Sequence, residues 1–142
     1  MIVIDTSAWI SATLPGDQHF PNTQPWLAHI RSSRTRFYVP AHFPAEVSGV
    51  LSRVRTEDRL LREAVEQIES SEQFVINPIS IRQGLFAAEI ARSARVRGSD
   101  AIFIALANEL DVPMITWDRQ QRERGVIFCR TMTPVEAMEM TA

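Results

Sequence analysis

The sequence predicts an α/β fold, a three-layer α/β/α sandwich with a mainly parallel central sheet. Short apolar segments alternate with longer segments whose apolar residues recur at helical spacing, a pattern typical of strand–helix–strand units. The short segments are apolar throughout, which favours strands with both faces covered by helices. A chain of 142 residues is expected to form a single domain over residues 1–142 and to bury roughly 70% of its unfolded surface.

The N-terminal half of the chain holds three predicted strands. The segment IVI before Asp5 is the first strand, and NTQPWLAHIR is the first helix, with Pro25 tolerated in its first turn. The segments RFYVP and FVINP are strands that end at proline. Between them, apolar residues recur every three or four positions across residues 41–53 and 56–70, which predicts two helices. Thr56 is the expected N-cap of the second helix.

The C-terminal half continues the alternation. Residues 80–96 form a predicted helix. Its inward face is expected to consist of Leu85, Ala88, Ala91 and Ala94, or of the residues next to them. Gly98 then interrupts the chain, and Ser99 or Asp100 is the expected cap of the apolar helix DAIFIALANEL. The remaining segments are PMITW as a strand, RQQRERG as a short helix, VIFC as a strand, and TPVEAMEM as a last short helix with Pro134 at its first position.

Composition excludes several classes of function. The formal net charge of −2 argues against a general polyanion binder, and all 15 basic residues are arginine, which excludes P-loop and Schiff-base enzymes that need lysine. Cys129, the only cysteine, lies in an apolar run and is expected to be a small buried hydrophobe. No apolar run approaches the ~20 residues of a membrane span, and no signal peptide is recognisable, so we expect a cytoplasmic protein.

Four carboxylates are expected to meet at one edge of the sheet. Asp5 and Asp118 each follow a predicted strand, and the carboxyl ends of parallel strands share the edge at which open α/β sheets bind ligands. Asp100 begins a helix, and it joins this edge if the helix enters from the same side. Glu46 is the only acid in AHFPAEVSGVL, where the other residues are expected to pack.

Each acid also has a simpler structural interpretation. Asp5 fits a turn residue, Asp100 and Asp118 fit helix N-caps, and Glu46 fits an exposed helix face. Together, however, the four would raise one another's pKa values by repulsion, and a divalent cation with oxygen ligands would remove that repulsion. Mg²⁺ suits a site made of carboxylates and water, and it can activate a water molecule for attack on a phosphodiester.

The same residues resemble a known family. The DTS motif that begins at Asp5, the helical Glu46, the run DAIFIALA from Asp100 and the TWD motif that ends at Asp118 resemble the PIN-domain nucleases. Within this family, the size of the chain and its DTS opening are similar to the VapC-type toxins of bacterial toxin–antitoxin pairs.

The resemblance implies an endoribonuclease that depends on Mg²⁺ or Mn²⁺. Its implied metal and catalytic residues are Asp5, Glu46, Asp100 and Asp118, and its implied supporting residues are Thr6, Ser7 and Thr116. It also implies an RNA substrate, a homodimer and a small antitoxin partner. That partner is expected to lay an apolar helix in a groove with residues 41–70 as one wall, and to direct an arginine at the four acids.

Two other functions fit parts of the pattern. A phosphotransfer domain of the receiver or aspartyl-phosphatase kind also places aspartates at strand ends. The phosphatase pattern, however, needs a second aspartate where this chain has Ser7, and both kinds use a lysine. A non-catalytic PIN-like RNA-binding or scaffold module is the alternative, but such a module should have lost some of the four acids.

The histidines and the tryptophans have mainly structural interpretations. His19, His29 and His42 share no metal-ligand spacing, so surface or helix-packing positions are expected, although the loop that holds His19 could approach a substrate. The three tryptophans are expected in the core. Trp9 is the best candidate among them for stacking on RNA, because it follows Asp5 closely.

Overall fold

The computed structural model describes residues 1–54 and 56–140, and it confirms the predicted fold class. Its strands form one five-stranded, all-parallel sheet in the order β3-β2-β1-β4-β5. The strands are β1 (Ile2–Ile4), β2 (Phe37–Pro40), β3 (Phe74–Asn77), β4 (Met114–Ile115) and β5 (Thr131–Met132). Because β1 is the central strand, the residue that follows it lies in the middle of the sheet edge.

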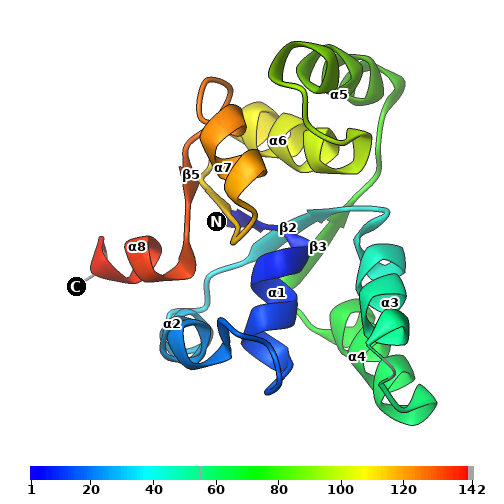
Figure 1. Cartoon of the computed structure of the whole chain (residues 1–142), viewed down its shortest axis with the longest axis vertical. Helices are drawn as coiled ribbons and strands as arrows, with labels where there is room; N and C mark the ends of the chain where they lie inside the picture. Colours follow the sequence, from blue (N-terminus) through cyan, green and yellow to red (C-terminus); the bar gives the residue numbers. More distant parts are fainter. Residues whose placement is uncertain (55, 141–142) are drawn as a thin grey trace.

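Helices cover both faces of the sheet (Figure 1). One face carries α5, α6 and α7, and the other carries the remaining helices. The helices are α1 (Thr6–Thr13), α2 (Phe20–Ser32), α3 (Phe43–Arg53), α4 (Asp58–Ser70), α5 (Ile81–Ala94), α6 (Gly98–Leu110), α7 (Arg119–Gly125) and α8 (Pro134–Glu139). None of the helices in the described part of the chain is long and apolar enough to cross a membrane.

The core explains why the central elements are so apolar. All three residues of β1 are buried, and α6 is buried on nearly every side because it lies between the sheet and α5. Phe37, Phe43 and Phe103 are fully buried between the layers, and the tryptophans Trp9 and Trp26 are 3% and 1% exposed. The prediction that Trp9 lies in the core is therefore confirmed, and Trp9 is not the exception that stacks on RNA, because its ring packs against Phe37 and Phe74 inside the protein.

Several predicted element boundaries are wrong for identifiable reasons. The segment after Asp5 was not predicted as a helix, yet it forms α1, whose serines and threonines have modest helix propensity and whose apolar residues are buried. Thr56 does not cap α4, which begins after Glu57. Pro25 lies inside α2, because that helix begins earlier, at Phe20. Leu85 is exposed, but Ala94 lies on the inward face of α5 as predicted, with Ala87 and Ile90 as the neighbours of Ala88 and Ala91. Gln83 is also buried on this face.

The VIFC segment is a turn and not a strand. Phe128 and Cys129 donate their backbone N–H groups to the Gly125 carbonyl, which closes the chain after α7. Pairing with β4 begins only afterwards, at Thr131. Partial burial raises the pKa of the Cys129 thiol to about 12, in agreement with a packing role. The last helix begins as predicted, with Pro134 in its first turn and a capping box before it.

Candidate active site

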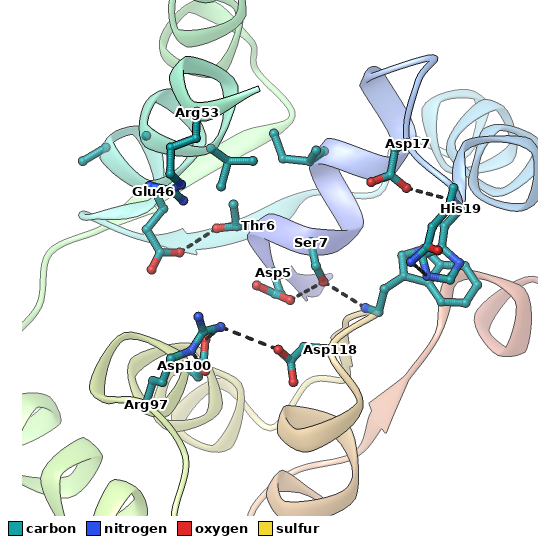
Figure 2. Close-up of a pocket in the computed structure, with 16 residues that line it drawn as sticks. Asp5, Thr6, Ser7, Asp17, His19, Glu46, Arg53, Arg97, Asp100 and Asp118 are labelled. Atoms are coloured by element: carbon teal, nitrogen blue, oxygen red, sulfur yellow. Dashed lines mark hydrogen bonds and ion pairs between the residues drawn. The ribbon is translucent and has the colours of Figure 1, made fainter. Parts of the chain in front are cut away.

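A pocket of about 460 Å³ opens at the carboxyl edge of the sheet. Because the sheet is all-parallel, the ends of β1 and β4 meet there, together with the first turns of α3 and α6. Figure 2 shows the labelled acids around this opening. All four predicted acids line it, each from a different element, namely Asp5, Glu46, Asp100 and Asp118.

Asp5 is the most deeply buried acid of the pocket, with 4% of its surface exposed. Ser7 Oγ and Thr116 Oγ1 both donate hydrogen bonds to its Oδ2 atom, over 2.6 Å each. Burial nevertheless dominates and raises the pKa of Asp5 from 3.8 to about 6, with a smaller contribution from the negative charge of Asp100. The carboxylate is thus held in one orientation by neutral donors, and no ion pair to it forms among residues 1–54 and 56–140.

Glu46 lies in the first turn of α3 and faces the same pocket. Thr6 Oγ1 donates a hydrogen bond of 2.7 Å to its Oε2 atom. Its Oε1 atom is 3.7 Å from Nε2 of His42, whose ring also lies edge-on against Phe103. Burial lowers the pKa of His42, although Glu46 and Asp100 act in the opposite direction. His42 is therefore expected to be neutral near pH 7, so the positive charge that attracts Glu46 in this pocket is that of Arg97.

Asp100 and Asp118 share one cation, Arg97. Its guanidinium donates to Asp100 from Nε over 2.8 Å and from Nη2 over 3.3 Å, and Nη2 lies 3.6 Å from Asp118 Oδ2. Burial still raises the pKa of Asp100, while the hydrogen bond and charge of Arg97 oppose this rise. The Arg97 side chain is 74% exposed, so it is free to leave both carboxylates.

The two ends of the pocket are linked by hydrogen bonds through Thr116 and Asp118. Thr116 Oγ1, which donates to Asp5, accepts the backbone N–H of Asp118 over 2.9 Å. Asp118 Oδ1 also accepts the Gln121 N–H and so caps α7, as its simpler interpretation predicted. Asp100, in contrast, does not cap α6. This helix begins at Gly98 with Arg97 in the cap position, which corrects the prediction for Ser99 or Asp100.

The donor set fits a hydrated magnesium ion better than a cage made of protein ligands. Among residues 1–54 and 56–140, no three Asp, Glu, His or Cys side chains are close enough to hold a metal together. Mg²⁺ is commonly held by one or two carboxylates and several waters, so this spacing suits it. The buried Asp5 carboxylate, with its raised pKa and its neutral donors, is the group that would gain most from a cation.

Three contacts of this pocket were not predicted from the sequence. Arg97 pairs with Asp100 three residues later, and His42 approaches Glu46 four residues later. Both spacings place side chains on one helix face, and this signal could have identified the pairs once the helix starts were known. The third contact is a stack of His19 on Trp117, which joins distant segments and has no local sequence signal.

Comparisons with known proteins agree with this geometry. A family model described as PIN domain matches residues 2–126. A search of curated protein sequences gives no match.

Solved structures share the fold over nearly the whole chain. VapC20 from Mycobacterium tuberculosis, described as a Sarcin-Ricin loop cleaving toxin, is 20% identical with a TM-score of 0.75, covering 88% of this chain and 95% of that one. FitAcB from Neisseria gonorrhoeae is 18% identical with a TM-score of 0.71, covering 94% and 98%. A toxin–antitoxin complex from Klebsiella pneumoniae is 18% identical with a TM-score of 0.63, covering 94% and 98%. At these identities the likeness shows the fold alone.

Proposed function

Because this chain belongs to the PIN-domain family, we propose that it is a metal-dependent endoribonuclease and the toxin of a type II toxin–antitoxin pair. The observation that best supports the proposal is the pocket at the sheet edge, where four acids from four elements meet. Such a cluster destabilises the metal-free fold through burial and repulsion, so a functional reason for it is favoured.

In this proposal one or two of the four acids bind Mg²⁺ or Mn²⁺ directly, and the others hold the ion through its water molecules. A bound divalent cation would lower the pKa of a water and offset charge on the phosphodiester during hydrolysis. The acids assigned to this role are Asp5, Glu46, Asp100 and Asp118.

The polar neighbours of these acids act as positioning residues. Ser7 and Thr116 fix the Asp5 carboxylate through two short hydrogen bonds, and Thr6 fixes Glu46 in the same way. Side chains that are already oriented lose little freedom when a cation and a substrate arrive, which favours both binding and catalysis.

Arg97 supplies part of the positive charge of the metal-free pocket. It pairs with Asp100 and Asp118, and its own side chain is 74% exposed whereas that of Asp100 is only 12% exposed. A divalent cation would compete with Arg97 for these carboxylates. The released guanidinium would then be free to contact an RNA phosphate, for which its planar donors are well suited.

The proposed partner is a small antitoxin. A hollow of about 430 Å³ between the end of α1 and helices α3 and α4 supports this part of the proposal. Its apolar lining includes Leu14, Leu51 and Leu60, and it lies along the predicted wall over residues 41–70. An apolar antitoxin helix would fit there, and an arginine from the same segment would compete with metal at the acids.

A homodimer in the cytoplasm belongs to the same proposal. Ile81 and Leu85 lie one turn apart on α5 and are 86% and 69% exposed. Exposed apolar side chains that form a contiguous patch mark sites of contact with another protein, so this face of α5 is the proposed dimer contact.

The test of the activity is incubation of the purified protein with total RNA in Mg²⁺ or EDTA, followed by mapping of new RNA ends. We expect new ends in Mg²⁺ only. Expression of the chain alone should arrest growth, and co-expression of the neighbouring gene should restore it. If the protein is harmless and releases no new ends, the toxin proposal fails.

The alternative is a non-catalytic PIN-like module that binds RNA or acts as a scaffold. One observation favours it, namely the wide spacing of the acids in the described chain, with Arg97 between two of them. RNA binding without any EDTA-sensitive cleavage would support this alternative over the nuclease.

A further inference from the structure

An aromatic pair lies at the rim of the acidic pocket. The rings of His19 and Trp117 are stacked with their centroids 4.1 Å apart and their planes 5° apart. Both residues line the pocket and both are only partly buried, in contrast to Trp9 and Trp26 in the core. The pair therefore presents a flat, partly accessible surface next to the acids.

Hydrogen bonds fix this pair relative to the acids. The backbone N–H of Trp117 donates to Ser7 Oγ over 3.0 Å, and the same hydroxyl donates to Asp5. The indole Nε1 of Trp117 donates to Thr23 Oγ1 over 2.9 Å, and Thr23 is completely buried. Because both ends of Trp117 are held, a group stacked on this pair would occupy a defined position relative to Asp5.

The loop before α2 adds polar groups beside the flat surface. Asp17 Oδ1 accepts the backbone N–H of His19 over 2.8 Å, and Gln18 Nε2 is 3.3 Å from His19 Nε2. Asp17 and Gln18 also line the pocket, and Figure 2 shows Asp17 and His19 on the side of the opening away from Glu46. A carboxylate and an amide supply the acceptors and donors that can read the edge of a base.

We propose that His19, stacked on Trp117 and flanked by Asp17 and Gln18, forms a subsite for an unpaired RNA nucleobase next to the bond that is cut. This inference rests on the proposed function, because it assigns the substrate contact of the same site. Stacking tolerates any base, and the loss of one stacked base typically lowers affinity for single-stranded nucleic acid roughly 10- to 100-fold.

The test measures binding in the full chain with the Asp5→Asn substitution, so that the RNA stays intact. The probes are short unstructured RNAs with 2-aminopurine at successive positions, because stacking quenches its fluorescence. We expect quenching at one position. His19→Leu should abolish that quenching and lower RNA affinity roughly tenfold or more, whereas His19→Phe, which keeps a flat ring, should retain both. His29→Leu, on α2, is the matched control and should change neither.

Two outcomes would overturn the subsite. The first is that 2-aminopurine is quenched at no position in the Asp5→Asn parent, a result that overturns the proposal even if His19→Leu fails to fold. The second is that His19→Leu lowers the melting temperature but leaves RNA affinity and 2-aminopurine quenching unchanged. His19 would then only shield Trp117 from water. The binding assay needs no cleavage, so failure of the nuclease proposal is recognised separately by the absence of new ends in Mg²⁺.

Discussion

Replacing Asp5 with asparagine should stabilise the metal-free protein, and the gain should depend on pH. Burial raises the pKa of Asp5 from 3.8 to about 6 in the folded protein. Between these two values the folded state retains a proton that the unfolded chain has released. The free energy of unfolding therefore falls as pH rises through this window, and it stays reduced above pH 6. A shift of this size corresponds to about 3 kcal/mol.

Asparagine has no charge to bury, so it removes this penalty. It accepts hydrogen bonds less strongly than a carboxylate, however, and it cannot satisfy both Ser7 and Thr116 in the same way. The loss of one such bond costs about 1 kcal/mol, so we expect a net gain of about 2 kcal/mol at pH 8. At pH 4, where Asp5 is protonated in the folded parent, the gain should vanish or become a loss of about 1 kcal/mol.

Urea unfolding in EDTA at pH 4 and pH 8 measures this difference, provided that the slopes of parent and variant agree. Asp58→Asn is the matched control, because Asp58 lies at the start of α4 with its side chain 75% exposed. If the effect of Asp5→Asn is the same at both pH values, burial does not control the protonation of Asp5, and the electrostatic description of the pocket is wrong.

The remaining predictions concern activity, metal and Arg97. Asp100→Asn should abolish EDTA-sensitive RNA cleavage with an unchanged circular dichroism spectrum, and undiminished cleavage would remove Asp100 from the site. Mg²⁺ or Mn²⁺ should raise the melting temperature, with a stabilisation of roughly 2.7 kcal/mol at 100 times the dissociation constant; a variant with carboxamides in place of all four acids should lose this shift. Arg97→Gln should tighten Mg²⁺ binding about two- to fivefold, because it removes a competing cation from Asp100 and Asp118, and it should weaken RNA binding in direct titrations.

The fold could be predicted from the sequence because its main signal is local. Apolar strands between amphipathic helices indicate a covered parallel sheet, and the ends of parallel strands share an edge. This is why the sequence alone predicts that Asp5 and Asp118 lie at the same edge. Asp100 followed from its position at the start of a helix, and Glu46 followed from being the only acid in a helical segment whose other residues pack.

The parts that the sequence did not reveal depend on contacts between distant segments. Helix α1 is stabilised mainly by burial and not by propensity, so its serines and threonines did not indicate it. The VIFC run was apolar enough for a strand, but the turn after Gly125 withdraws it from the sheet. The stack of His19 on Trp117 forms only once α2 and the end of β4 are brought together.

The central claim is that the acids of this pocket bind the divalent ion on which RNA cleavage depends. One Mn²⁺ titration tests it, with bound Mn²⁺ followed by electron paramagnetic resonance and new RNA ends counted in the same samples. We predict that occupancy and cleavage rise together in the parent, and that Asp100→Asn weakens binding and abolishes cleavage at equal Mn²⁺. Two results would contradict the claim. One is cleavage at Mn²⁺ concentrations too low to occupy the site, and the other is Mn²⁺ binding and cleavage that are unchanged in Asp100→Asn.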